Sequence, residues 1–210
     1  MSAEPSVAAR QKRLSHDERR RLIIETTLAC LARNGADGTS LRSVCRDMGV
    51  APSLVTHFFA GWHDLLLAAY ELLLERFMAQ LTPLMTQAFP SARARMEELI
   101  RRYLRTDWLG ENTIGANIAL WQLSRSVVDL QPAFSRSLQQ RTDLLREALA
   151  ALAVEQGARI DVDDMTACFI LMLDGVWLEL SLNPANFTDE RASRICWSWI
   201  NAVVGVARQG

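Results

Sequence analysis

The stretch TSLRSVCRDMGVAPSLVTHFF, residues 39–59, predicts two short helices joined by a tight turn. Thr39 or Ser40 suits the N-cap of the first helix, because a side-chain oxygen there accepts a hydrogen bond from a free backbone N–H. The apolar residues of this helix recur at the spacing of one helical face: Leu41, Val44, Cys45 and Met48. Gly49 follows where helices commonly end in the left-handed region, which glycine enters at little cost.

The second helix of the pair is expected to begin at Pro52, because proline suits the first helical position. The apolar residues that would face inward are Leu54, Val55, Phe58 and Phe59. Ser53, Thr56 and His57 would then point outward. Two short helices with a glycine in the turn are typical of a helix-turn-helix that places one helix in a DNA groove. The same spacing also fits an ordinary helical hairpin, so it leaves both interpretations open.

The longer stretch GTSLRSVCRDMGVAPSLVTHFFAGWHDLL, residues 38–66, resembles the DNA-binding part of the TetR family of bacterial transcriptional regulators. Within that family, THFF (56–59) and DGVWL (174–178) are most similar to the choline-responsive BetI branch. The N-terminal resemblance covers about a third of the chain. Two residues depart from the family pattern: Ala51 replaces the usual Ser or Thr cap, and Trp62 replaces a phosphate-contacting Lys. These departures concern the contact with the DNA backbone and leave the motif intact.

The residues expected to contact DNA are Thr39, Ser40, Arg42, Pro52, Ser53, Thr56, His57 and Phe58. Ser53, Thr56 and His57 are the candidates for the groove, because they share the outward side of the second helix. Beside Thr56, His57 is expected to contact a phosphate. The resemblance implies that a further set positions the DNA backbone: Thr39, Ser40, Arg42 and Phe58.

The distribution of charge favours a small DNA-reading part on an acidic body. The chain has 210 residues, of which half are hydrophobic, so it is expected to be globular with one or two domains. Residues 1–60 carry nine basic and six acidic side chains, while the whole chain has a net charge of −1. The four cysteines form no CxxC pair and are expected to be small buried residues in a reducing compartment. With no secretory or membrane-spanning segment recognised, a cytoplasmic protein without a membrane partner is expected.

The periodicity of the whole chain predicts an all-α protein of about nine helices. Three would form an N-terminal helix-turn-helix domain, residues 1–60, in which 1–14 are a flexible arm and Ser15 with Glu18 caps the first helix. Six would form a ligand-binding and dimerisation domain, residues 61–210. The expected helices of this second part are 62–88 with a break near Pro83, 91–109, 113–129, 132–156, 162–182 and 189–207.

The last two expected helices are apolar on more than one side. Residues 165–182 are apolar almost all round, and residues 189–207 carry two apolar stripes. A helix that is apolar all round must be covered all round. A homodimer formed through these two helices would supply the cover, as in the family, whereas a helix buried within one subunit is the alternative, mainly for the first of the two.

The second domain is expected to bind a small-molecule effector. The residues expected at this site are Trp108, Asn117, Trp121, Asp174 and Trp177. Aromatic side chains attract quaternary ammonium ions through their ring faces, and a carboxylate in an apolar helix needs a partner. A bound cation would give Asp174 that partner, as the BetI resemblance implies. An arginine or a helix N-terminus would serve as well, and tryptophans at helical spacing commonly belong to a core.

These observations favour a ligand-responsive repressor that binds a pseudo-palindromic double-stranded DNA operator as a homodimer. The sequence lacks the motifs of an enzyme: no GxSxG, HExxH or glycine-rich phosphate loop is present, and the three histidines all lie in residues 16–63. No cofactor or metal site is expected. The alternative is a helical adaptor or structural dimer with a degenerate helix-turn-helix, which Ala51 and Trp62 would fit.

Overall fold

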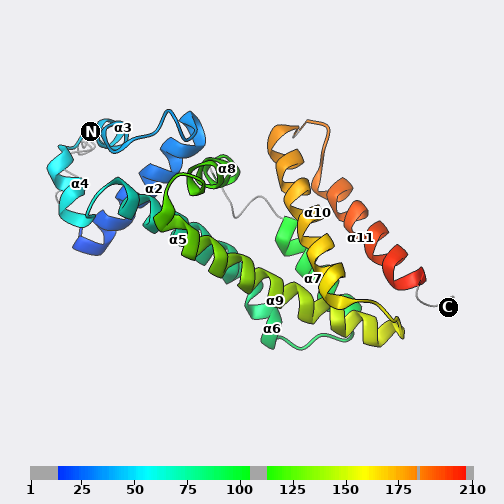
Figure 1. The fold of residues 1–210 in the computed structure, drawn as a ribbon. Helices are drawn as coiled ribbons and strands as arrows, with labels where there is room; N and C mark the ends of the chain where they lie inside the picture. The colour runs from blue at the N-terminus through cyan, green and yellow to red at the C-terminus, as the bar shows by residue number, and fades with distance from the viewer. Residues whose placement is uncertain (1–13, 105–112, 184, 207–210) are drawn as a thin grey trace, which may run out of the picture. The chain divides into compact units, whose positions relative to one another are not determined.

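The computed structural model describes residues 14–104, 113–183 and 185–206, and within these ranges all regular structure is helical (Figure 1). The helices are α2 (His16–Asn34), α3 (Leu41–Met48), α4 (Pro52–Phe58), α5 (Trp62–Leu81), α6 (Pro83–Thr86), α7 (Ala92–Leu104), α8 (Thr113–Ser124), the 3₁₀ turn η2 (Val128–Leu130), α9 (Gln131–Gln156), α10 (Val162–Leu182) and α11 (Asp189–Val206). Counting α5 and α6 as one helix broken at Pro83 gives nine α-helices in the described ranges, so the predicted fold class is confirmed. Except for Leu14, the expected arm lies outside these ranges.

Local capping explains where the N-terminal helices begin and end. Ser15 and Glu18 form the predicted capping box of α2, with Glu18 N donating to Ser15 Oγ over 3.2 Å. Ser40, rather than Thr39, is the N-cap of α3, and its hydroxyl accepts from Ser43 N. Gly49 ends α3 at φ +66°, where a residue with a Cβ would be strained. The turn between α3 and α4 therefore depends on this glycine.

The helix expected at 113–129 ends earlier than predicted, at Ser124. The hydroxyls of Ser124 and Ser126 donate to the carbonyls of Trp121 and Leu123. Serine side chains that bond nearby carbonyls compete with helix continuation, which accounts for the early end. The chain then makes the turn η2 before α9 begins at Gln131.

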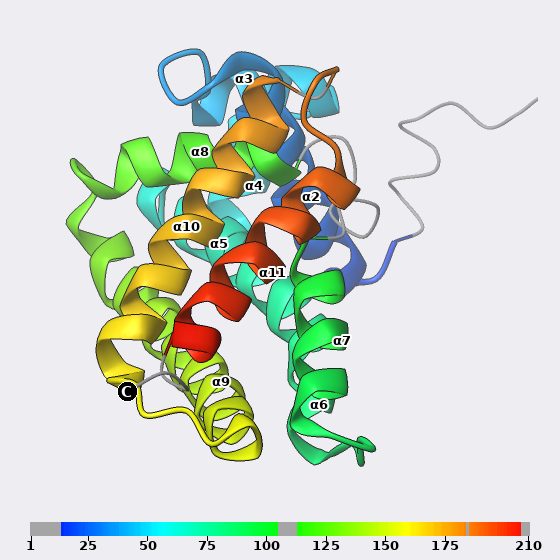
Figure 2. The same cartoon turned by 90° about the vertical axis from the view of Figure 1, so that its right-hand side faces the viewer.

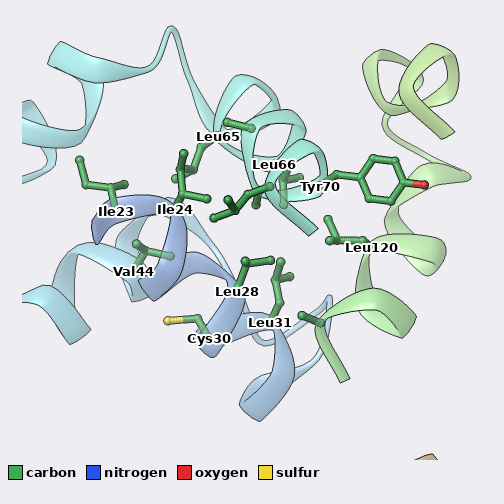
Figure 3. Packing of buried hydrophobic residues seen from close by; sticks show 14 of the residues in the cluster. Ile23, Ile24, Leu28, Cys30, Leu31, Val44, Leu65, Leu66, Tyr70 and Leu120 are labelled. Carbon is green, nitrogen blue, oxygen red and sulfur yellow. The ribbon is translucent and has the colours of Figure 1, made fainter. Parts of the chain in front are cut away.

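The chain forms two compact units, each of which is described by itself. The first contains α2, α3, α4, α5 as far as Leu74, α8, η2 and the beginning of α9 as far as Phe134. Its core is built on the buried side of α2, where Ile23, Ile24, Leu28 and Leu31 meet residues of α3, α5 and α8 (Figure 3). Val44 of α3, Leu66 of α5 and Leu120 of α8 belong to the same cluster. Helix α2 is thus the centre of this unit.

Helix α8 belongs to the same compact unit as the helix-turn-helix. It packs along α2, and Gly115 makes the close approach possible: a Cβ at this position would lie 3.0 Å from the carbonyl oxygen of Ala32. The division by compactness therefore differs from the expected functional division at residue 60. That functional division stays a prediction.

The second unit contains the last part of α5 from Glu75, α6, α7, α9 from Ser135, α10 and α11. Helices α10 and α11 lie side by side (Figure 2). The N-terminus of α7 is capped from α9, because the carboxylate of Glu155 accepts from Ala92 N and Arg93 N, the latter over 3.2 Å. The buried residues of this core include Leu99, Leu145, Phe169 and Leu173. Over the described ranges, no helix is both long and apolar enough to cross a membrane.

Replacing Gly115 by Val should separate α8 from α2, because the added side chain meets backbone atoms of Ala32. We expect the free energy of unfolding to fall by about 1–3 kcal/mol, as for other overpacked sites. Urea denaturation followed by circular dichroism measures this change. The control is Gly61→Val, where an added Cβ meets nothing within 4 Å. Equal stability of the two variants would contradict the packing of α8 on α2.

Candidate nucleic-acid interface and ligand site

Helix α4 is held by its inner side and carries polar residues on its outer side. Val55 and Phe59 are buried in the core of the first unit, and the guanidinium of Arg20 in α2 lies 4.9 Å from the centre of the Phe59 ring. The N-cap residue Ala51 makes no side-chain hydrogen bond, so α4 begins without a cap. The predicted inward side of this helix is therefore present, and packing rather than capping fixes it.

The predicted outward residues of α4 are all exposed, namely Ser53, Thr56 and His57, and so is Pro52, the other DNA-contact candidate at the start of this helix. The Thr56 hydroxyl lies 3.3 Å from the carbonyl oxygens of Pro52 and Ser53, so its hydrogen is directed toward the helix and its lone pairs remain available to accept. These short polar side chains can exchange hydrogen bonds with base edges or phosphates. Their contact with DNA stays a prediction.

The three expected backbone-contacting residues near α3 differ in environment. Thr39 is buried, and its hydroxyl lies 2.7 Å from Gly35 O and 3.1 Å from Cys30 O, which ties the start of α3 to the end of α2. Ser40 and Arg42 are exposed. An exposed arginine at the beginning of α3 is suited to a phosphate, whereas Thr39 already has hydrogen-bond partners within the protein.

His16 of α2 packs against α4, although it was not among the predicted DNA-contacting residues. Its ring centre lies 4.6 Å from that of Phe58 and 6.3 Å from that of His57, and its side chain is 66% exposed. Phe58 is half-buried beneath these two rings. The first residue of α2 therefore extends the polar surface of α4. No local pattern could have indicated this, because the two helices meet only in the folded chain.

Three aromatic rings of the second unit form a cluster. Phe77, Tyr103 and Trp177 contact one another edge to face, with centres 5.1–6.1 Å apart. Tyr103 is fully buried, and burial raises the pKa of its hydroxyl well above the usual range, so the group stays neutral. Trp177 is half-buried. One of the predicted ligand residues, Trp177, thus belongs to a ring cluster together with Tyr103 and with Phe77, which the sequence did not single out.

Asp174 is paired with an arginine, which is one of the alternatives that the sequence left open. Arg141 Nη1 donates to Asp174 Oδ1 over 2.7 Å, and Nη2 donates to Oδ2 over 3.2 Å. Nη1 also donates to the Tyr103 hydroxyl over 3.0 Å. Removing one partner of a fully buried pair costs roughly 3–5 kcal/mol. Since the Asp174 side chain is 31% exposed, we expect the removal of Asp174 or of Arg141 to cost an amount at the lower end of that range.

The remaining ligand candidates are not joined to this cluster by any described contact. Trp108 lies outside the described residues. Asn117 and Trp121 lie on α8 in the first unit, and both are half-buried. A surface hollow of about 460 Å³ lies in the first unit at the start of α5, between Ala60 and Asp64 on one side and Asp129 on the other. None of the predicted ligand residues lines that hollow.

The fold and the exposed side of α4 are those of a helix-turn-helix protein. Residues 92–205 match the family model described as the C-terminal part of BetI-type transcriptional repressors. The chain belongs to this family, the BetI-type repressors within the TetR regulators, whose members are transcriptional regulators and not enzymes.

Individual relatives agree with this assignment over almost the whole chain. The regulator BetI of Paraburkholderia phymatum is 24% identical over 89% of this chain and 93% of its own length. A crystal structure described as a transcriptional regulator of Pseudomonas aeruginosa is 31% identical, covers 97% of this chain and 99% of its own, and has a TM-score of 0.84. A regulator of Saccharomonospora viridis solved with choline is 19% identical over 89% of this chain and 97% of its own, with a TM-score of 0.76.

Replacing Ala51 by Ser should stabilise the protein, because the new hydroxyl can accept from a free N–H at the start of α4. We expect a gain of about 0.5–2 kcal/mol in the free energy of unfolding. The matched control is Ser40→Ala, which removes the cap that α3 has and should lower stability by a similar amount. Urea denaturation of both variants measures the effects, and an unchanged midpoint for Ala51→Ser would contradict the missing cap.

Proposed function

We propose that this protein is a homodimeric repressor that binds a pseudo-palindromic operator and is released by a small-molecule effector. The observation that carries the proposal is the exposed polar side of α4, formed by Ser53, Thr56 and His57 on a helix whose other side is buried. The family assignment supports the regulatory part. The operator, the dimer and the effector site are the parts that belong to this proposal.

The need for two copies of α4 follows from the small binding energy that one short helix can supply in a DNA groove. A good base contact is worth only about 1–3 kcal/mol, so α4 alone gives little specificity. Two copies related by a two-fold axis read half-sites roughly 34–36 Å apart or at a multiple of that distance. The effector would shift the population toward dimers in which the distance between the two copies of α4 does not match the spacing of the half-sites.

The outward side of α10 supports dimerisation. Five of its exposed residues recur at alternating steps of three and four: Cys168, Leu171, Gly175, Leu178 and Leu182. Ala167 and Glu179, next to Cys168 and Leu178, are exposed as well. Leu171 and Leu182 are each 71% exposed. On α11, Ile195 and Ala202, seven residues apart, are also exposed. Apolar side chains at this spacing form the seam of packed helices, and a second copy of the same face is the cover that we propose.

The effector site is proposed at the ring cluster of the second unit, where the predicted residues Asp174 and Trp177 lie. Choline in the Saccharomonospora viridis structure supports a quaternary ammonium ion as one candidate. The pairing of Asp174 with Arg141 limits that candidate, because the carboxylate already has a cation. Choline is therefore one of the ligands whose binding is to be measured.

Replacing Thr56 and His57 together by Ala should remove operator binding while leaving the fold intact, because both side chains are exposed. We expect the affinity for a palindromic fragment from the region upstream of its own gene to fall by at least about 1–3 kcal/mol for each half-site. Electrophoretic retardation measures this change. Wild-type binding should also weaken steeply as salt rises.

The melting temperature and the oligomeric state of this double variant serve as controls, and both should match the wild type. If operator affinity survives the double substitution, the recognition helix has been misassigned. If the wild-type protein retards no fragment at low salt, the alternative of a helical adaptor with a degenerate helix-turn-helix applies.

Replacing Leu171 and Leu178 together by Glu should separate the dimer, because charged side chains would lie in the proposed apolar seam. Analytical ultracentrifugation should show half the wild-type mass, and operator retardation should be lost with it. The control is Val154→Glu, because Val154 on α9 is 82% exposed and lies outside the seam. A doubly substituted protein that keeps the wild-type mass would place the interface elsewhere.

A further inference from the structure

Arg141 forms hydrogen bonds through the Nη atoms of its guanidinium but, among the described residues, none through Nε. Its two Nη atoms donate to both carboxylate oxygens of Asp174 and to the hydroxyl of Tyr103. Its Nε atom is buried and has no hydrogen-bond partner among the residues that the structure describes. The donor on this edge is therefore unsatisfied within the described protein.

A buried N–H without a partner is unfavourable, because the group has lost its hydrogen bonds to water and gained none. Nearly all such groups in native structures have a partner in the protein, in ordered water or in a ligand. What the Nε atom requires is an acceptor atom. The requirement is chemically specific, since an arginine donates and does not accept.

The charge around this donor disfavours a cation. Arg141 faces Asp174 through a two-point ion pair, so the carboxylate charge is already offset. A positive ligand would have to displace the guanidinium from Asp174 or lie beside it. The hydroxyl of the third group, Tyr103, is neutral and gives no further negative charge.

The exposure of the cluster indicates the side from which a ligand would reach it. Tyr103 is 1% exposed and closed to solvent, whereas the side chain of Asp174 is 31% exposed and Trp177 is half-buried. Phe77 and Trp177 offer apolar ring surface next to these polar groups. A ligand with an apolar ring and an acceptor group at one end would satisfy both kinds of surface.

We propose that the effector of this regulator is an aromatic carboxylate, with one carboxylate oxygen accepting from Nε of Arg141 and its ring packed against Trp177. The inference rests on the proposed function for its regulatory meaning. A carboxylate is one of the acceptors that arginine binds strongly, and the five donors of a guanidinium allow it to bind two carboxylates on different edges. Arg141 is then a ligand-binding residue, and Asp174 is the ion-pair partner on the other edge of its guanidinium.

Arg95 gives a matched control for this assignment. Its Nε atom is also buried without a partner among the described residues, and its side chain is 16% exposed, as is that of Arg141. It donates to Glu147 over 3.0 Å and lies 3.2 Å from the sulfur of Met85. Its described hydrogen bonds are to these two residues and not to Tyr103 or Asp174.

The test compares benzoate, phenylacetate and choline as ligands of the full-length protein by isothermal titration calorimetry. We expect at least one carboxylate to bind the wild type more tightly than choline and to release a retarded operator fragment. Arg141→Lys keeps a positive charge opposite Asp174 but has no Nε donor, so its affinity for that carboxylate should fall at least about tenfold, or 1.4 kcal/mol. Arg95→Lys should bind it with wild-type affinity.

Asp174→Asn is a second test, because this substitution should change the affinity for a carboxylate and the affinity for a cation in opposite directions. Without the negative charge beside it, a bound carboxylate should gain affinity, whereas a cation that depends on Asp174 should lose it. This comparison does not require Arg141→Lys to fold well. Thermal melting of every variant checks that the binding changes do not follow from unfolding.

Three results would overturn the inference: choline binding more tightly than both carboxylates, neither carboxylate binding, or Arg141→Lys binding a carboxylate as well as the wild type does. In each case a water molecule on Nε becomes the explanation of the free donor. Operator retardation without ligand is measured separately. Its absence would remove the proposed function, whereas retardation without carboxylate binding would remove this inference alone.

Discussion

The packing of α2 against three other helices is the constraint on which the recognition surface depends. Ile23, Ile24, Leu28 and Leu31 occupy its buried side, and helices α3, α5 and α8 converge there (Figure 3). Helix α4 has only seven residues and no side-chain cap, so it could not hold its position alone. It is held because Phe59 and Val55 enter the core that α2 organises, and because Arg20 of α2 lies over the Phe59 ring.

The place of α8 in this unit shows what the sequence could and could not predict. The sequence predicted a helix over 113–129, and local signals such as Ser15, Gly49 and Pro83 placed most helix ends correctly. The helix against which α8 packs could not be predicted. Hydrophobic residues indicate that a face is buried, but they do not indicate which other helix covers it. Gly115 becomes informative only when Ala32 is known to lie against it.

The same limit applies to the ligand site. The sequence indicated that Asp174 needs a partner, and both a bound cation and an arginine satisfied that requirement. Arg141 lies 33 residues away on another helix, with nothing in its own surroundings to single it out. A buried ion pair forms only when the chain folds and brings its two residues together. Asp174 can be recognised in the sequence because it lies in an apolar helix, whereas Arg141 has no such unusual surroundings. A resemblance to a choline-responsive branch cannot replace this information, because the relative solved with choline is 19% identical to this chain.

The outward side of α10 differs in kind from the solvated faces of the same unit. On α7 the exposed positions Arg93, Glu97 and Arg101 are charged at steps of four. On α10 no charged residue lies between Met165 and Leu173, and Asp174 is directed to Arg141. Glu179 is the one exposed charged residue after Asp164 in this helix. A helix that faced only water would gain nothing from leucines at Leu171, Leu178 and Leu182, since each apolar side chain left in water forgoes roughly 1.5–3 kcal/mol of burial. In the homodimer that we propose, a second copy of the chain would cover this face by symmetry, and the same symmetry would give the two copies of α4 that a palindromic operator requires.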